Sequence, residues 1–448
     1  MTTAKSTEAL SPWKSYEKVL FRFFFIYFLL QVVPLDPKFY AELFNAEEGY
    51  PLYGYIFNIS RYAPHFFSAE ESFLNWAVVA VIALVGTAIW TAKDKGREEY
   101  HSLYYWLRVI LRYRLALGVI GYGFIKVYPL QSPFPSLSNL NTNYGDLTSW
   151  KIFSMTLGIV PGYESFLGWV EILAGLLLLY RQTATIGAFL VIVYTGNVFL
   201  ANLAYEGGEY VYAFYLIVIA LFLVAYDAIR LYTLFGLEKP TAPNIFKPHF
   251  QGNQKSIRLA LKSAFVLIFL VVYGFATQRG FQTDPYQYPK TAGLPDASGI
   301  YEVAEFRLND SVIPYSAVDS LRWKDVVFEK WATLSVRSNR PVILDSTNIE
   351  TIRVADSERR YEIAGSAGRH YYTYRIDSDR NVLHLENKNK HYPDDKIELN
   401  FTRPNARQII LSGRNSQQEA IYVVLNKKDK KYLFEEVAKQ GRGKALEL

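Results

Sequence analysis

The chain of 448 residues contains no cysteine. Disulfides, cysteine-ligated zinc, iron–sulfur clusters, c-type haem attachment, thiol redox motifs and a lipid on an N-terminal cysteine are therefore excluded within this chain. Histidine is scarce, with six residues, and none lies in a segment that we expect to span a membrane. A haem held there by axial histidines is accordingly not expected. The motifs H-E-x-x-H, G-x-x-x-x-G-K-[ST] and G-x-S-x-G are also missing. The sequence thus predicts no metal site and no cofactor held by the chain's own ligands.

The net charge of +6, with a pI near 9.0, does not indicate a nucleic-acid partner. In the first 280 residues the basic side chains gather in loops between apolar runs, as the positive-inside rule describes for membrane proteins. The lipid bilayer is therefore the partner that the charge distribution predicts.

Hydropathy divides the chain into unlike parts. We expect a polar tail over residues 1–16, a transmembrane helical domain over 17–280, and a domain of ordinary soluble composition over 281–448. The first apolar run follows lysines, as in a signal peptide. It leads into Val33-Pro34-Leu35-Asp36-Pro37 without a small-x-small cleavage site, so we expect it to be retained as a helix.

The apolar runs predict about seven membrane-spanning helices. The loop from 93 to about 114 is the most basic in this half, which places it on the cytoplasmic side. Alternating the sides puts the N-terminus in the cytoplasm and residues 281–448 on the opposite side. The expected spans are about 19–33, 73–92, 107–129, 165–180, 186–203, 210–231 and 261–277.

The C-terminal part has the pattern of an all-β antiparallel domain. Short alternating segments, such as G-I-Y-E-V-A-E-F-R-L and A-I-Y-V-V-L-N, recur at about ten-residue spacing with turn residues between them. Eight or nine such strands predict a small barrel or sandwich, of the lipocalin-like kind. A barrel of this size can hold a small ligand, but its interior is more often filled by side chains.

Two expected spans that face each other across an external loop each carry one charge at membrane depth, Lys126 in the first and Glu171 in the second. Both are one to two turns from the outer ends of neighbouring antiparallel helices, so they should lie at a similar depth. One interpretation is a structural ion pair that keeps the helices in register. The other is an outward-facing polar pocket in which the lysine binds an anionic or carbonyl group and the glutamate relays protons.

Other polar side chains near the outer surface are candidates for the same cavity. They are Glu164 outside the Glu171 helix, Asn197 and Asn202 on the fifth span, and Tyr122 on the third. For either asparagine alone, an interhelical hydrogen bond is the simpler interpretation. No catalytic residue can be assigned from the sequence.

The segment from about 107 to 235 resembles the DoxX-like membrane family, which has a four-helix core. The likeness depends on G-Y-G-F-I-K-V-Y-P, on Y-G-D-L-T-S, on G-x-x-E-x-x-x-G-L-L-L-L-Y-R-Q-T-A-T-I-G-A and on N-V-F-L-A-N-L-A-Y. Lys126 and Glu171 would be the family's membrane lysine and glutamate. The extra helices and the β-domain resemble a larger version of the family from Bacteroidota, which implies a bacterial inner membrane and a periplasmic β-domain.

Some family members resemble subunits of quinone-reducing complexes. The resemblance therefore implies an accessory subunit of a quinone-linked redox complex or another membrane complex, with a bound quinone or lipid and with membrane or periplasmic protein partners. A second hypothesis is a non-enzymatic scaffold whose β-domain docks a protein or lipid. A third is a membrane enzyme acting on lipid headgroups at the outer leaflet through Lys126, Glu171 and Glu164.

Overall fold

A computed structural model of the chain describes residues 13–45, 47–64, 66, 72–242, 246, 252–347, 351–441 and 443. The chain divides into two compact units. The first, here called the helical unit, comprises Met1–Tyr128 and Gly162–Phe281. The second, here called the barrel unit, comprises Pro129–Pro161 and Gln282–Leu448. The boundary near 281 follows the shift in composition, whereas residues 129–161, expected as an external loop of the helical domain, belong to the barrel unit.

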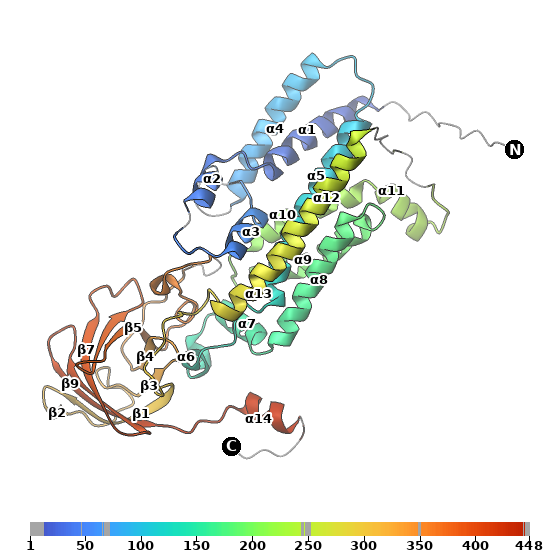
Figure 1. Cartoon of the computed structure of the whole chain (residues 1–448). Helices are drawn as coiled ribbons and strands as arrows, with labels where there is room; N and C mark the ends of the chain where they lie inside the picture. The colour runs from blue at the N-terminus through green and yellow to red at the C-terminus, as the bar shows by residue number, and fades with distance from the viewer. Residues whose placement is uncertain are drawn as a thin grey trace. The chain divides into compact units, whose positions relative to one another are not determined.

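The helical unit consists of helices (Figure 1), and two of its stretches, η2 and η3, are π-helical. Ser72 begins α4 by accepting a hydrogen bond from the amide of Leu74, and Asp36 caps α2 through Lys38 in the same way. The elements are α1 (Ser15–Val32), α2 (Pro37–Phe44), α3 (Leu52–Ser60), α4 (Phe73–Lys93), α5 (His101–Val127), α8 (Pro161–Leu179), α9 (Ala184–Ala204), α10 (Tyr210–Ala225), α11 (Ala228–Leu231), η2 (Tyr232–Gly236), α12 (Asn253–Val266), η3 (Leu267–Val272) and α13 (Tyr273–Thr283).

Five helical segments of the described chain are long and apolar enough to cross a membrane. A sixth would be formed by α10 and the segment Ala228–Gly236, which meet at a bend of 69°. The chain is therefore a multi-pass membrane protein. The expected third span lies in α5, which is not among them because four cationic side chains lie along it. The five segments are Ser15–Ala41, Phe73–Lys93, Pro161–Leu179, Ala184–Ala204 and Asn253–Thr283.

Helix α5 is the central helix of this unit. It packs against α1, α3, α10 and η3, and most of its residues from Arg114 to Val127 are buried. An isolated apolar helix would not need so many protein neighbours in lipid, but a helix with cationic side chains does. The central position of α5 thus gives its cationic side chains the protein neighbours that they need in lipid.

Buried Arg114 fastens α3 to α5. The basic stretch predicted as a cytoplasmic loop, from 93 to about 114, ends at this arginine, but helix α5 runs through it from His101 to Val127. Its guanidinium donates to the carbonyl oxygens of Ser60, at 2.7 Å, and Tyr62, and to the Tyr212 hydroxyl at 3.3 Å. Ser60 and Tyr62 lie at the end of α3, so a single charged side chain holds this short helix against the bundle.

The barrel unit contains a closed antiparallel barrel of eight strands. Strands β1 and β3 to β9 pair in order, and β1 also pairs with β9, which closes the sheet; two-residue β2 only extends the turn after β1. The barrel form of the prediction is therefore confirmed. The strands are β1 (Gly299–Leu308), β2 (Ser311–Val312), β3 (Asp325–Phe328), β4 (Thr333–Arg337), β5 (His370–Asp377), β6 (Val382–Asn387), β7 (Lys396–Asn405), β8 (Gln408–Arg414) and β9 (Ala420–Lys427).

Side chains fill the barrel. Along β7, β8 and β9 alternate residues are buried, as expected for strands with one face toward a core. The buried cluster is rich in aromatic and branched side chains, so the interior is a packed core. Its largest members include Tyr301, Phe306, Phe328, Tyr372 and Tyr374.

The segment from 129 to 161 is built into the barrel unit. It forms α6 (Leu137–Leu140), the 3₁₀ turn η1 (Tyr144–Asp146) and α7 (Ser149–Gly158). The Glu329 carboxylate accepts hydrogen bonds from the amides of Leu137, at 3.2 Å, and Ser138, at 2.7 Å. The side-chain Nδ2 of Asn139 donates to the carbonyl oxygen of Glu362 at 2.8 Å. These bonds attach the segment to residues about 200 positions further along the chain.

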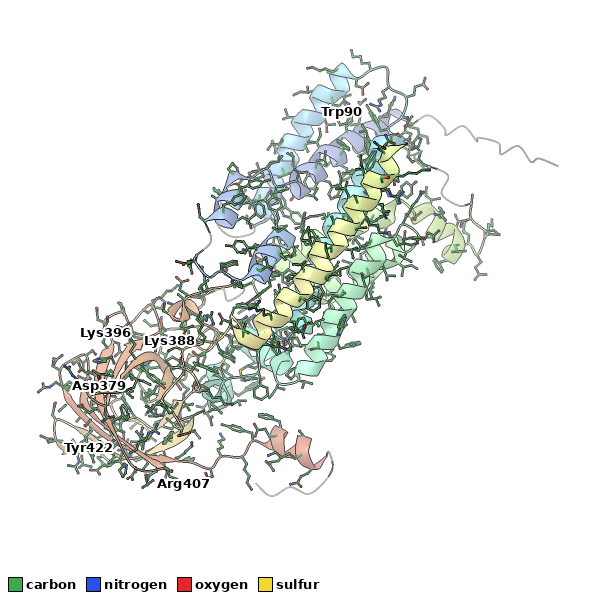
Figure 2. All side chains as sticks on the ribbon, in the orientation of Figure 1. Trp90, Asp379, Lys388, Lys396, Arg407 and Tyr422 are labelled. Atoms are coloured by element: carbon green, nitrogen blue, oxygen red, sulfur yellow. The ribbon has the colours of Figure 1, made fainter. Side chains whose placement is uncertain are left out.

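Buried charges meet where this segment packs. Lys388, labelled in Figure 2, pairs with Glu362 at 2.7 Å, and both side chains are buried. Burial, together with the Glu362 carboxylate, raises the pKa of Glu329 to about 7. Burial also lowers the pKa of Lys151 to about 7, against the opposing influence of Glu362. The protonation state of Glu329 and Lys151 at this junction therefore changes with pH near neutrality.

A last short helix, α14 (Leu433–Gln440), follows the barrel.

Candidate functional site

Lys126 and Glu171 meet in the helical unit. Lys126 lies in the last turn of α5 and Glu171 lies near the middle of α8. The Nζ–Oε1 distance is 2.6 Å, and the side chains are only 11% and 7% exposed. Two charges in such a place are stable only if each balances the other.

Glycines bring the two helices close enough for this pair. A Cβ atom on Gly168 would lie 2.5 Å from the backbone oxygen of Gly123 and from the backbone nitrogen of Val127. The Ser165 hydroxyl donates to the carbonyl oxygen of Val127 at 2.8 Å, one turn nearer the helix ends. Small residues of this kind allow close packing of helices in membranes. The contact fixes the depth of Glu171 relative to Lys126.

Two tyrosine rings flank the lysine. The Nζ atom of Lys126 lies 5.7 Å from the ring centroid of Tyr122 and 5.7 Å from that of Tyr194. This is within the range of a cation–π contact. Glu164, one side chain of the predicted set, is 2% exposed and within electrostatic reach of the ammonium. Tyr194 was not predicted, because a tyrosine in an apolar run does not stand out from the other tyrosines of the chain.

The second carboxylate oxygen of Glu171 has no hydrogen-bond partner among the described residues, although it is buried. A buried acceptor without a donor is costly, and native proteins contain few of them. The pair therefore offers a donor, the Lys126 ammonium, and an uncommitted acceptor beside it. A small polar group with an oxygen that can accept or donate would complement both.

A second ion pair is linked to the first through Tyr122. The Tyr122 hydroxyl donates to Oε2 of Glu209 at 2.7 Å, and Arg61 binds Oε1 of the same carboxylate at 2.5 Å. Arg61 does not belong to the predicted set, since it was expected in a loop. Its signal was weak because loops normally carry charge.

The two asparagines differ from the other predicted residues. The Asn202 amide donates to the carbonyl oxygen of Val198 at 2.9 Å, and its oxygen accepts from the amide of Glu209 at 3.4 Å, so it joins the end of α9 to the start of α10. Asn197 is exposed on α9. Of the predicted set, Glu171, Glu164 and Tyr122 thus lie near the Lys126 ammonium. Asn202 instead joins the end of α9 to the start of α10.

Comparisons of the chain with protein-family models, with curated proteins and with solved structures found no match. Among the residues that the structure describes, no group of three or more His, Asp or Glu side chains is arranged to hold a metal ion.

Proposed function

We propose that the helical unit binds the polar head of a lipid-soluble molecule at Lys126 and Glu171, as an accessory subunit of a quinone-linked or other membrane complex. The observation that carries the proposal is the buried ammonium beside a carboxylate oxygen that has no donor among the described residues. In the oxidised form of a quinone head, a carbonyl oxygen accepts a hydrogen bond from the Lys126 ammonium. In the reduced form the same oxygen is a hydroxyl, and it donates a hydrogen bond to the Glu171 carboxylate. The ligand chemistry therefore suits both redox forms of such a head.

The surroundings of the pair support entry from the lipid. Tyr163, Phe166 and Trp169 are exposed along α8, on the same helix as Glu171. Aromatic side chains are common where a helix meets the interfacial region of the bilayer. The flanking rings of Tyr122 and Tyr194 suit a flat, apolar ring with a polar edge.

A proposed topology of seven spans accompanies this function. Residues 129–161 and 282–448 fold into one unit, so both lie on the same side of the membrane, which requires an even number of crossings between 162 and 281. Helices α8, α9, bent α10–α11 and α12–α13 supply four. Counting α1, α4 and α5 before residue 129 puts the N-terminus on the opposite side. The basic loops then indicate a cytoplasmic N-terminus and a periplasmic barrel unit in a bacterial inner membrane.

A scaffold that only presents the barrel unit to a partner is the second candidate. The glycine contact between α5 and α8 favours it, because an ion pair within such close packing also serves as a clasp. The two candidates differ in whether the pair is needed for a ligand or for the bundle.

The test is to purify the full chain in a mild detergent, extract it with organic solvent and identify the extracted molecules by mass spectrometry. We expect a quinone near one equivalent in the wild type, and its loss in Lys126→Met and Glu171→Gln variants that remain folded by circular dichroism. An empty wild-type protein with a stoichiometric protein partner would contradict ligand binding and support the scaffold.

A further inference from the structure

The helical unit contains a large groove at the end of α5 opposite to Lys126. Its volume is about 1510 Å³, and α5, the end of α8, the start of α9, α11 and α12 contribute its walls. Arg112, which lines it, precedes Lys126 by 14 residues, or roughly 21 Å along an α-helix. The groove is therefore a separate feature from the Lys126–Glu171 pair.

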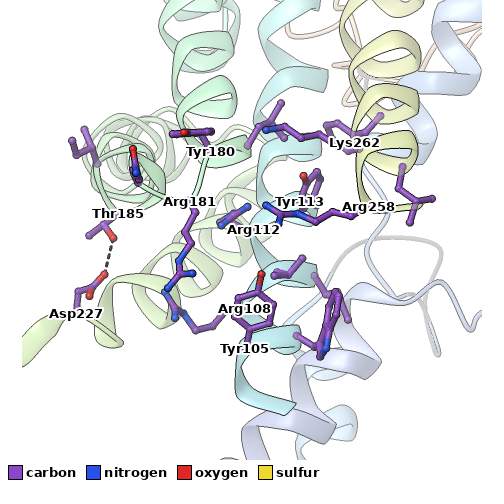
Figure 3. A pocket seen from close by; sticks show the side chains of 18 of the residues that line it. Tyr105, Arg108, Arg112, Tyr113, Tyr180, Arg181, Thr185, Asp227, Arg258 and Lys262 are labelled. Carbon is purple, nitrogen blue, oxygen red and sulfur yellow. Dashed lines mark hydrogen bonds between the residues drawn. The ribbon is translucent and has the colours of Figure 1, made fainter. Parts of the chain in front are cut away.

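Cationic side chains dominate the groove. Six of the lining residues are arginine or lysine, and one is a carboxylate, Asp227. Asp227 is already engaged by Arg230 at 2.8 Å and by the Thr185 hydroxyl at 2.8 Å. Figure 3 shows Arg258 and Lys262 extending from α12 toward α5. The cationic residues are Arg108, Arg112, Arg181, Arg230, Arg258 and Lys262.

Two of these arginines are half-buried and lack an anionic partner in the described part of the chain. The Nε atoms of Arg108 and Arg112 are buried and have no hydrogen-bond acceptor there. The guanidinium of Arg108 instead stacks 3.2 Å from the ring centroid of Tyr226. Stacking fixes the plane of the guanidinium but supplies no negative charge to it.

The spacing of the cations is unfavourable unless an anion is present. Arg108 and Arg112 are separated by four residues on α5, and so are Arg258 and Lys262 on α12. Like charges at this spacing repel each other across one helical turn. A phosphate between the two helices would remove the repulsion, since arginine binds phosphate through paired N–H donors.

The groove is also partly apolar. Its walls include Ile110, Leu179, Leu261 and Phe265, and its volume exceeds the few hundred to about 1,000 Å³ typical of small-molecule pockets. Trp106 and Tyr180 add aromatic surface of the kind found at membrane interfaces. A ligand with a charged head and an apolar tail would contact both parts.

We propose that this groove binds the phosphate head of an anionic phospholipid, with the proximal part of its acyl chains against the apolar wall. Basic pockets between membrane helices on the cytoplasmic side recognise such heads. Pyrophosphate is also an anion with phosphate oxygens but lacks the tail, so the two sources of the anion can be separated experimentally.

The experiment measures thermal unfolding of the full chain in a nonionic detergent during titration with four additives. These are cardiolipin, phosphatidylglycerol, phosphatidylcholine and sodium pyrophosphate. We expect saturable stabilisation by the two anionic lipids, none by phosphatidylcholine, and half-saturation by pyrophosphate only at much higher concentration.

Variants connect the effect to the groove. Lys262→Gln should raise the half-saturating lipid concentration about five-fold, which corresponds to the contribution of one cation near a membrane surface. The variant combined with Arg112→Gln should raise it about 25-fold. Lys262→Arg should retain binding, and Lys255→Gln serves as the matched control, because Lys255 is exposed on the same helix and does not line the groove.

Several results would overturn the proposal. Equal stabilisation by phosphatidylcholine and phosphatidylglycerol would show that binding does not depend on the charge of the lipid. Unchanged lipid titrations for folded Lys262→Gln, or the same shift for Lys255→Gln, would show that the lipid binds outside the groove. Half-saturation by pyrophosphate at the lipid concentration would show a soluble anion as the ligand instead.

Discussion

Three buried cations of the helical unit, Lys126, Arg114 and Arg22, have different kinds of partner. Lys126 has a carboxylate, whereas Arg114 has carbonyl and hydroxyl oxygens. Arg22 donates to the Tyr100 hydroxyl at 2.9 Å and to the Thr91 hydroxyl at 2.9 Å. Neutral acceptors suffice for a guanidinium with five donors, but the compact ammonium is paired with a counter-ion.

Removing one partner of this pair should be worse than removing both. In Lys126→Met, Glu171 stays buried without a counter-ion, and we expect a loss of about 3–5 kcal/mol in the free energy of unfolding. In Lys126→Met/Glu171→Gln no charge remains, so most of that loss should be recovered. Thermal unfolding of the purified variants in detergent measures both. Equal stability of the single and double variants would show that the charges do not depend on each other.

At the scale of elements, the contact between α5 and α8 should tolerate no added side chain. We expect Gly168→Ala to weaken the bundle, because its Cβ atom would lie 2.5 Å from backbone atoms of α5. Gly196→Ala on α9 is the matched control, since nothing lies within 4 Å of that Cβ position, and alanine favours a helix over glycine by up to about 1 kcal/mol.

Melting temperatures of the two variants should therefore move in opposite directions. Destabilisation by Gly196→Ala of the same size as by Gly168→Ala would contradict the close packing of α5 on α8.

The junction between residues 129–161 and the barrel should respond to pH. The pKa of Glu329 is raised to about 7, so the folded state binds an extra proton between about pH 4.5 and 7. Stability from this group is therefore present below pH 4.5 and is lost as the pH rises through 7. For Lys151, whose pKa is lowered to about 7, stability is present above pH 10.5 and is lost as the pH falls through 7.

Stability of the barrel unit should thus pass through a minimum near pH 7. Glu329→Gln should flatten the acid limb, whose slope is at most about 1.4 kcal/mol per pH unit for one proton. The measurement is urea unfolding of the full chain at several pH values, followed by near-ultraviolet circular dichroism. A slope that persists in Glu329→Gln would assign the pH dependence to another group.

For the whole molecule, the absence of cysteine makes sidedness directly measurable. Ser378→Cys lies exposed in the turn between β5 and β6, and Ser256→Cys lies exposed at the start of α12. In intact spheroplasts, a membrane-impermeant maleimide should label Ser378→Cys, and it should label Ser256→Cys only after lysis. Labelling of both variants, or of Ser256→Cys alone, before lysis would contradict the proposed topology.

The sequence predicted what depends on local pattern. Alternation in the last third indicated an antiparallel β-domain, and counting turns from the span ends put Lys126 and Glu171 at one depth. The grouping of residues 129–161 with the barrel could not be predicted, because it depends on Glu329 and Glu362, about 200 residues away. The cationic groove was missed for a similar reason. Its arginines come from separate loops and helices, where each one alone only marks a cytoplasmic side.

The central claim is that the Lys126–Glu171 pair binds a polar, lipid-soluble head, and a direct binding measurement tests it. The full chain in lipid nanodiscs is titrated with a short-chain ubiquinone analogue, and quenching of tryptophan fluorescence is recorded. We predict saturable binding near one equivalent that weakens at least ten-fold in Lys126→Met/Glu171→Gln and is unchanged in Asn197→Ala, whose side chain is exposed on α9. Binding of equal affinity to the wild type and to the folded double variant would contradict the claim.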